Sequence, residues 1–529
     1  MARLAERSQD TAPDRAEGAI AARGMADAAA LLARNWVLQL TNVPYLGRGK
    51  QDSDLKAHLE RRFFEAKSDL ATAMLVRMLR SSTAGGSISI VSPQNWLFLP
   101  SYLGLRQRLL NESSLNQIAI LGEHGFESAQ AAGAFVALST ITNAHPDAAT
   151  EATGLDCNEA QTPSAKAALL QSTVFEAVKQ EAQRNNPDQR IAVRPLESGN
   201  PFSQYAVTFQ GIKSGDDARF RAKSWEVIST EWRRLQAAGD GSQLFDGCSD
   251  VIFWGHDGRH LTRRRDEGQE AARKYRGIAI AQMRDMPVSV LAAEAFDSNI
   301  SPVFCLNEDH AAPILTFCES QDFKDLVRSY EPTLKTNNGT FTQVPFDLEL
   351  WRASAADRYP NGLPEPYSDD PTQWLFHGHP GQAEIGTALH VALARLCGHR
   401  WPAEIDTEMR LSSEARAWIA RAAELPSSDA DGLLPLVACG GEAPLAERLR
   451  SYARVAFGDA WSADLETRLV AEADAKLGGT TKRSAVTIDD WLRTRAFAQH
   501  AKLFHHRPFL CMSGTAATTG SARSRIIIG

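Results

Sequence analysis

The chain has 529 residues, of which 43% are hydrophobic and 23% are charged, and its formal net charge is −7. This composition is typical of a globular protein with roughly three or four domains. No apolar run reaches the ~18 residues that a membrane-spanning helix needs, and the N-terminus lacks the charged-then-apolar layout of a signal peptide. The acidic balance counts against a small nucleic-acid-binding module, but it does not exclude a large DNA enzyme.

The cysteines and histidines give no sign of a metal centre. The seven cysteines are scattered, odd in number and never in a Cys-x-x-Cys pair, which argues against structural zinc and against a disulfide framework. His377 and His379 have no acidic or cysteine partners at ligand spacing. We therefore expect a cytoplasmic protein with reduced thiols and no bound metal.

An atypical segment and an α/β region make up the first 148 residues. Residues 1–34 are rich in Ala, Arg and Asp; 17–34 predicts a helix, and no strand there is followed by a Gly-rich turn. From 35 to 148, short apolar runs alternate with helical periodicity. Predicted strands are 36–40, 87–91, 118–121 and 134–141, and predicted helices are 54–80 and the later part of 95–110. This order predicts the second half of a doubly wound α/β sheet.

Three further regions follow along the chain. Residues 149–345 predict a mixed α+β region. The polar, Ala-rich stretch 143–190 overlaps its beginning and is interpreted as a boundary or an insertion. Residues 346–510 are mainly helical, and their first part, 346–380, reads as an ordered long loop dense in Pro, Tyr and Trp. Residues 511–529 are small and polar and predict an irregular tail.

A short loop after the first predicted strand carries the most informative motif, Asn42-Val43-Pro44-Tyr45. Its position, between a strand and a helix, places it at the carboxyl edge of the sheet, where α/β folds bind ligands. Asn-x-Pro-Tyr is also a common turn string, so the four residues alone leave a structural turn open as the alternative.

The flanks of this loop extend the pattern to much of the chain. The stretches TNVPYLGRGKQ, EAKSDLATAMLVRML, GGSISIVSPQNWLFLPSYLGLRQRLL and LGEHGFESAQAAGAFVALSTI resemble γ-class adenine-N6 DNA methyltransferases, in particular the large Eco57I-type and BREX (PglX-like) enzymes of phage defence. Downstream, FQGIKSGDDARFRAKSWEV resembles the segment that opens the target-recognition region of that family. In patches, the resemblance covers roughly residues 36–510.

The resemblance implies a chemistry for the loop. Asn42 and the carbonyl of Val43 would accept hydrogen bonds from the two N–H groups of the adenine amine, whose lone pair is otherwise delocalised into the ring. Pro44 would stiffen the loop, and Tyr45 would stack on a base flipped out of double-stranded DNA. The methyl donor would be S-adenosylmethionine. By the same resemblance Phe126 would be a second base-stacking aromatic and Tyr102 would contact the cofactor; an ordinary core aromatic is the alternative for both.

The chain departs from the family pattern in three places. Val43 replaces the usual first proline, so the carbonyl is kept but some rigidity is lost. The Gly-containing cofactor turn, which in the family precedes the loop, has no room in 1–34, since one βαβ unit takes ~30 residues; we expect a fragment that relies on a separate chain for the cofactor-binding half. After Arg507-Pro508-Phe509 the chain leaves the family pattern. A back-translation with one base restored can, with one permitted choice of codons, be read as LWHVWDGRHDGLGALANYHR, which resembles the family. We therefore expect 511–529 to be out of frame.

Basic residues in 149–345 are candidate DNA contacts. The strongest cluster includes Arg263, Arg264 and Arg265, and a second contains Lys213, Arg219, Arg221 and Lys223. Phosphate contact is one interpretation, and a solvated face compensated by nearby acidic residues is the other. The sequence thus predicts a site-specific adenine methyltransferase of a restriction-modification or BREX system. The alternative is a catalytically inactive DNA-binding or specificity subunit of a defence complex.

Overall fold

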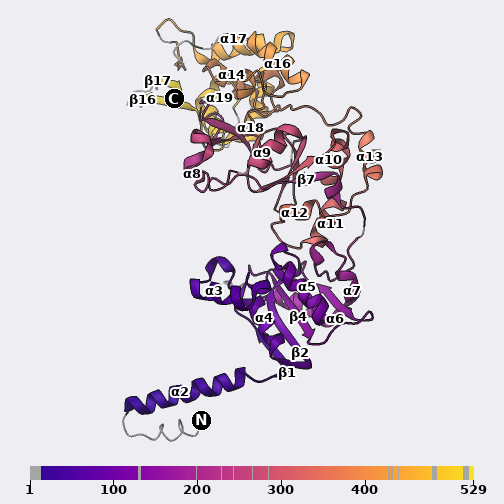
Figure 1. Ribbon diagram of the computed structural model, residues 1–529. Coiled ribbons are helices and arrows are strands. Elements are labelled where there is room, and N and C mark those ends of the chain that lie inside the picture. Colours follow the sequence, from indigo (N-terminus) through magenta and orange to yellow (C-terminus); the bar gives the residue numbers. More distant parts are fainter. Residues whose placement is uncertain are drawn as a thin grey trace. The chain divides into compact units, whose positions relative to one another are not determined.

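The computed structural model describes residues 13–528 apart from 129–132, 198, 228, 242, 265, 284, 427–428, 430–432, 439, 479–484 and 516–522. The chain folds into two compact units (Figure 1). Unit 1 contains the chain up to Gly199 together with Asp325–Thr336 and Gln343–Pro345, and unit 2 contains the remainder. No helix among the described residues has the length and apolar character needed to cross a membrane.

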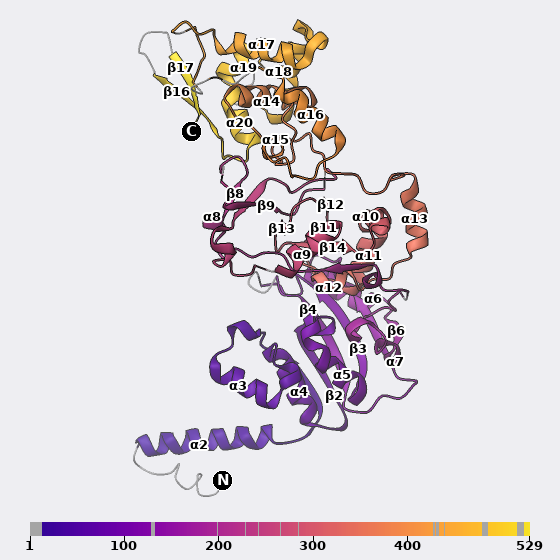
Figure 2. The ribbon, with the colours of Figure 1, turned by 45° about the horizontal axis from the view of Figure 1, so that its top comes forward.

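A six-stranded sheet with the order β1-β2-β4-β3-β5-β6 forms the centre of unit 1 (Figure 2). Its strands are β1 (Trp36–Asn42), β2 (Ser82–Pro93), β3 (Ser114–Gly122), β4 (Val136–Thr142), β5 (Glu151–Asp156) and β6 (Glu176–Lys179). β1 is parallel to β2 and β3 to β5, while β4 is antiparallel to both β2 and β3 and β6 is antiparallel to β5. Therefore β1, β2, β3 and β5 all end at the same edge of the sheet.

The helices of unit 1 are α2 (Pro13–Leu32), α3 (Ser53–Arg62), α4 (Leu70–Arg80), α5 (Leu103–Glu112), α6 (Pro163–Ser172) and α7 (Gln180–Gln183). Of these, α4 and α5 pack on one face of this sheet and α6 packs on the other, while α2 is exposed along most of its length. The buried side chains of α4 and α5 share one core with Ile88, Ile90, Ile118 and Ile120, which alternate along β2 and β3. Leu169 and Leu170 of α6 pack instead with Val91 and Leu121, which point to the opposite face.

The predicted strands of residues 35–148 are confirmed, because each overlaps an observed strand. The predicted helix over 54–80 is instead two helices, α3 and α4. The break occurs because Asp69 adopts an extended backbone and its side chain accepts a hydrogen bond from Ala71 N, capping α4. Residues 17–34, predicted helical, largely coincide with α2.

The sheet also continues beyond the predicted boundary at 148. β5 and β6 lie in the stretch that was expected to be a boundary or insertion, and unit 1 extends to Gly199. The signal was weak because β5 is short and contains Gly154, and β6 has only Val178 buried. The buried guanidinium of Arg190 donates hydrogen bonds to Tyr330 O and to the side chain of Gln343, which ties the two later segments into the same unit.

Two four-stranded sheets form the first part of unit 2, in the orders β13-β9-β10-β8 and β12-β11-β14-β7. Their strands are β7 (Ala206–Thr208), β8 (Arg221–Lys223), β9 (Trp232–Gln236), β10 (Asp250–Phe253), β11 (Gly277–Ala281), β12 (Val288–Leu291), β13 (Ala295–Phe296) and β14 (Ile300–Cys305). The accompanying helices are α8 (Asp217–Phe220), α9 (Asp266–Lys274), α10 (Ala311–Glu319) and α12 (Asn338–Phe341). The first residues of α11 (Gln321–Tyr330) belong to unit 2, and the rest of this helix, from Asp325, belongs to unit 1.

Helices dominate the chain from 346 onward, as predicted. They are α13 (Leu348–Ala356), α14 (Ala388–Leu396), α15 (Pro402–Ile405), α16 (Ser413–Ala423), α17 (Leu445–Phe457), α18 (Ala463–Leu477), α19 (Ile488–Thr494) and α20 (Ala496–Leu503). α14 lies at the centre of their apolar core and is buried along its whole length. Within the long loop that follows α13, residues 371–380 are all buried, so this stretch is an ordered part of unit 2.

The described parts of the C-terminal tail differ from the predicted irregular segment. β16 (Leu510–Thr515) pairs antiparallel with β17 (Arg523–Ile528), which also pairs with β15 (Leu434–Pro435). Three consecutive isoleucines, 526–528, give β17 the β-branched composition that favours a strand. Turn composition alone therefore underestimated the regular structure of this segment.

Candidate active site

The Asn-Val-Pro-Tyr loop leaves the carboxyl end of β1 and is clamped by the side chain of Asp69. Asp69 Oδ1 accepts hydrogen bonds from Leu46 N at 3.3 Å and from Ala71 N at 2.9 Å. Leu46 O in turn accepts from Leu70 N at 3.1 Å and from Gln51 Nε2 at 3.1 Å. Asp69 and Gln51 are both buried, so these bonds are shielded from water. The clamp therefore holds the backbone of the loop next to Val43 and Tyr45.

Two hydrogen-bond acceptors stand next to each other at the end of β1. Asn42 is exposed, and its side chain makes no hydrogen bond with any described residue. The Val43 side chain is buried in the core, and its N–H donates to Val91 O at 3.4 Å. No described group donates to the Val43 carbonyl. The side-chain amide and the neighbouring carbonyl are therefore both available to a ligand.

The structure brings Tyr45 and Phe126 to one apolar cluster. Both rings are partly buried and pack against a group formed by Leu121, Val136, Leu155 and Cys157 at the carboxyl ends of the strands. The Tyr45 hydroxyl is buried without a hydrogen-bond partner among the described residues. Burial, reinforced by the charge of Asp69, raises the pKa of Tyr45 to about 12. The phenol is uncharged at neutral pH, as it would be at its ordinary pKa, and the shift moves its ionisation further above that range.

Tyr102 lies in a different environment from the one that the resemblance implies. It is only 6% exposed and belongs to the core beneath α4 and α5. Burial, followed by the charge of Asp69, raises its pKa. This is the position of an ordinary core aromatic, and a contact between Tyr102 and a cofactor stays a prediction.

Sequence reasoning missed the residues that hold the loop. Asp69 and Gln51 were absent from the predicted site, although Ser68-Asp69 directly precedes the apolar helix pattern of α4. An Asp at that position is a helix N-cap signal, and it would have indicated the break between α3 and α4. Nothing local in the sequence signals that the same carboxylate also binds Leu46.

Backbone pairing in unit 2 brings together two of the predicted DNA-contacting cations. Lys213 and Arg263 form an antiparallel bridge, with each N–H donating to the other's carbonyl at 3.0 Å. Arg219 is exposed on α8 and lies over the ring of Phe220, 5.0 Å from its centroid. In the described part of the chain, none of these three forms an ion pair. Their charges are free to meet an external anion.

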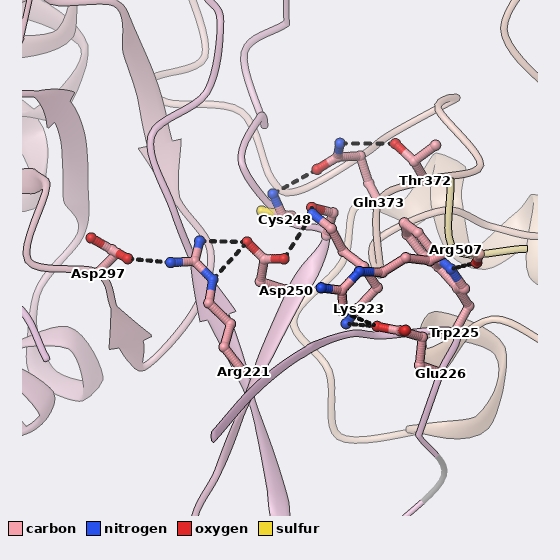
Figure 3. A network of polar contacts seen from close by, with 11 residues as sticks. Arg221, Lys223, Trp225, Glu226, Cys248, Asp250, Asp297, Thr372, Gln373 and Arg507 are labelled. Carbon is pink, nitrogen blue, oxygen red and sulfur yellow. Dashed lines mark hydrogen bonds and ion pairs between the residues drawn. The ribbon is translucent and has the colours of Figure 1, made fainter. Parts of the chain in front are cut away.

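The other predicted cations are not equally available. Arg264 pairs with Asp266 and donates to Asp257 O, and Arg265 lies outside the described residues. Arg221 binds Asp250 at 2.6 Å and Asp297 at 2.5 Å, and Lys223 binds Asp250 at 2.8 Å (Figure 3). Burial opposes the charge on Asp250, but Arg221 and Lys223 outweigh it and lower the pKa of this carboxyl group. Arg221 and Lys223 are therefore structural cations.

Metal-ligand geometry is not found in the described residues, where no three His, Cys, Asp or Glu side chains gather as a metal ion would require. His377 and His379 are buried beside aromatic rings rather than exposed in a loop. Burial lowers the pKa of each to about 4. Both imidazoles are thus neutral at physiological pH.

Comparisons with known proteins point to DNA modification over part of the chain. A stretch of 96 residues is 29% identical to the adenine-specific methyltransferase PglX of Lacticaseibacillus casei (strain Zhang), and 96 residues are 31% identical to the adenine-specific methyltransferase BrxX of Escherichia coli O9:H4 (strain HS). Each match covers 18% of this chain and 8% of the relative. The chain is therefore similar to named adenine methyltransferases, over a small part of their length. No protein-family model matches it.

Solved structures of restriction-modification enzymes are similar at a low level. The type IIL enzyme MmeI in complex with DNA has a TM-score of 0.37 at 15% identity, covering 79% of this chain and 56% of that chain. A nuclease-deletion mutant of the type ISP enzyme LlaGI with a DNA substrate mimic has a TM-score of 0.39 at 12% identity, covering 63% and 42%. At these scores the likeness adds no detail to the site.

Removing the Asp69 carboxylate tests the clamp. We expect Asp69→Ala to lower the free energy of local unfolding around the loop by about 1–2 kcal/mol. The substitution removes a helix cap and also the acceptor of the hydrogen bond from Leu46 N. Amides in 45–51 are then expected to exchange with deuterium about tenfold faster. Asp69→Asn keeps an acceptor oxygen, and its amide exchange rates in 45–51 are expected to stay close to those of the unaltered chain.

Asp52→Ala is the matched control, since Asp52 caps α3 through Leu55 N alone. It is expected to speed exchange in the first turn of α3 without affecting 45–47. Equal exchange at 45–47 in the Asp69→Ala and unaltered chains would contradict the clamp.

Proposed function

We propose that this chain presents the target base in a site-specific DNA adenine-N6 methyltransferase of a restriction-modification or BREX phage-defence system. The reaction is methyl transfer from S-adenosylmethionine to the amine of an adenine flipped out of double-stranded DNA. The observation that carries the proposal is the pair of unoccupied acceptors, the Asn42 amide oxygen and the Val43 carbonyl, beside Tyr45. The partial similarity to PglX and BrxX supports it.

Each residue of the loop has a task in this proposal. An adenine amine is a weak nucleophile because its lone pair is delocalised into the ring. When its two N–H groups donate to Asn42 and to the Val43 carbonyl, the nitrogen becomes more tetrahedral and its lone pair turns toward the incoming methyl group. Preorganised acceptors lower the barrier because they need no rearrangement during the reaction. The rings of Tyr45 and Phe126 hold the extruded base by stacking.

The described residues do not make a complete site for the methyl donor. β1 is the outermost strand of its sheet, and Tyr102 is buried in the core. The side chains of Val37, Leu38 and Leu40 on β1 are 71%, 58% and 68% exposed. Folded proteins avoid a free apolar edge strand of this kind. We therefore include in the proposal a cofactor-binding half whose strand pairs with β1. The assays below supply this half as the polypeptide encoded immediately upstream.

A catalytically inactive DNA-binding subunit of a defence complex is the second candidate function. It is favoured by the free cations of Lys213, Arg219 and Arg263, which lie in unit 2 and do not depend on the loop of unit 1. DNA binding without methylation, alone and with the upstream-encoded polypeptide, would support this candidate.

The role of Asn42 is tested by methylation of genomic DNA with labelled S-adenosylmethionine. The chain is assayed alone and together with the polypeptide encoded immediately upstream. We expect label to enter DNA in the mixture, and Asn42→Ala to reduce the rate by about 100-fold or more, as loss of one preorganised hydrogen-bonding group does elsewhere. Asn111→Ala changes an exposed amide on α5 and is expected to leave the rate unchanged. Equal rates for the two variants would refute the assignment.

The cations of unit 2 are tested by DNA binding at several salt concentrations. We expect Lys213→Ala and Arg263→Ala each to weaken binding to mixed-sequence duplex DNA and to reduce the slope of log K against log salt by about 1, because one phosphate contact is lost. Arg273→Ala serves as the control, since Glu294 already neutralises Arg273 at 3.2 Å. An unchanged slope in all three variants would show that DNA does not contact this bridge.

A further inference from the structure

Lys166 is a buried cation in unit 1 that the proposed chemistry does not use. It lies on α6, is 2% exposed, and its ammonium group donates hydrogen bonds to Leu121 O at 2.5 Å and to Cys157 O at 2.8 Å. Leu121 is at the end of β3, and Cys157 directly follows β5. One side chain therefore joins the carboxyl ends of two parallel strands at the edge that carries the candidate site.

The burial of this ammonium group is costly. In the described part of the chain no carboxylate lies within ion-pair distance of it, although Asp156 is near enough to influence it. Burial lowers the pKa of Lys166, an effect that electrostatic interactions with Cys157 and Asp156 only partly offset. An apolar side chain of similar length would fill the same space at less cost in desolvation. In return for this cost the ammonium group satisfies two buried carbonyls, which an apolar side chain would leave without a donor.

Of the two carbonyls that Lys166 binds, that of Leu121 stands at the start of the loop that carries Phe126, and that of Cys157 lies in the turn after β5. Gly122, which follows Leu121, has a φ of +65°, and a Cβ there would lie 1.9 Å from Asn158 Oδ1. The start of the loop is thus fitted closely against the turn after β5. Since Phe126 comes only four residues after Gly122, the anchor at Leu121 limits where its ring can lie.

Helix α6, which carries Lys166, also packs against the apolar cluster on which the Phe126 ring lies. Leu169 and Leu170 of α6 pack on the cluster that contains Leu121 and Cys157, and the rings of Tyr45 and Phe126 pack on that cluster as well. A shift of α6 relative to β3 would therefore change the distance between the two rings. A base held between them needs that distance to be constant, because stacking depends on close contact of flat surfaces.

We propose that Lys166 is a positioning residue, whose two hydrogen bonds to the ends of β3 and β5 hold Phe126 at stacking distance from the base on Tyr45. The placement of Phe126 follows from this chain's own contacts, and its consequence for the base rests on the proposed function. Lys166 touches neither DNA nor cofactor in this account. In this proposal, replacing Lys166 affects the base only by displacing the loop that begins at Gly122 and carries Phe126.

The placement of Phe126 can be tested without any ligand. 4-Fluorophenylalanine is incorporated at position 126, and fluorine NMR spectra are compared for the unaltered chain, Lys166→Met and the control Lys179→Met, which changes an exposed lysine on β6. We expect the resonance to move toward that of the free amino acid in Lys166→Met and to be unchanged in Lys179→Met. The circular dichroism spectrum is expected to be the same in all three. An unchanged resonance, or a Lys166→Met chain that does not fold, would overturn the proposal.

The consequence for the base is tested in the methylation assay with the upstream-encoded polypeptide. We expect Lys166→Met to lower kcat by about tenfold or more, as a small displacement of a positioning group does, with DNA affinity within about twofold of the unaltered chain. If Lys166→Met instead loses DNA affinity while its kcat is unchanged, the proposed positioning role of Lys166 is overturned. If the unaltered chain does not methylate while the fluorine resonance still moves in Lys166→Met, the proposed function fails and the anchoring of Phe126 stands.

Discussion

The candidate site depends on one carboxylate, that of Asp69. The same oxygen caps α4 and holds Leu46 N, so the helix that covers the sheet and the loop that follows β1 are fixed to each other. Because Asp69 is buried, the two hydrogen bonds form in a low-dielectric environment where they are stronger than in water. The negative charge also acts on Tyr45 and Tyr102, and together with burial it raises the pKa of both phenols. The geometry and the electrostatics of the loop therefore have a common origin.

A second principle separates structural charges from available ones. Arg221, Lys223 and Arg264 carry the same formal charge as Lys213 and Arg263, yet each is engaged by an acidic side chain. Lys213 and Arg263 are joined through their backbones, which leaves their side chains unpaired. For a protein with a net charge of −7, the few cations without a partner matter more for an anionic ligand than the total. Lys166 is a third kind of cation, because its ammonium group is buried in unit 1 and donates hydrogen bonds to two backbone carbonyls.

Periodicity predicted the local elements of unit 1 well, because β2 alternates buried and partly buried side chains along most of its length and β3 ends in a short apolar run. The loop at Asn42 was located from its motif and from its place after a strand. The parts that sequence could not supply involve distant residues. Asp250 and Asp297 neutralise Arg221 from 29 and 76 positions away, and no local pattern reports such pairing. The inclusion of β5 and β6 in the sheet, and the burial of Tyr102, likewise depend on tertiary packing rather than on composition.

The most direct test of the account is the chemical identity of the methylated base. DNA treated with the chain, the upstream-encoded polypeptide and S-adenosylmethionine carrying an isotopic methyl group is digested to nucleosides, which are separated and identified by mass spectrometry. Two acceptors aimed at an exocyclic amine predict that the label appears only in N6-methyl-2′-deoxyadenosine and disappears in Asn42→Ala. Label in a cytosine nucleoside, or in N6-methyl-2′-deoxyadenosine at an equal level in Asn42→Ala, would contradict the account.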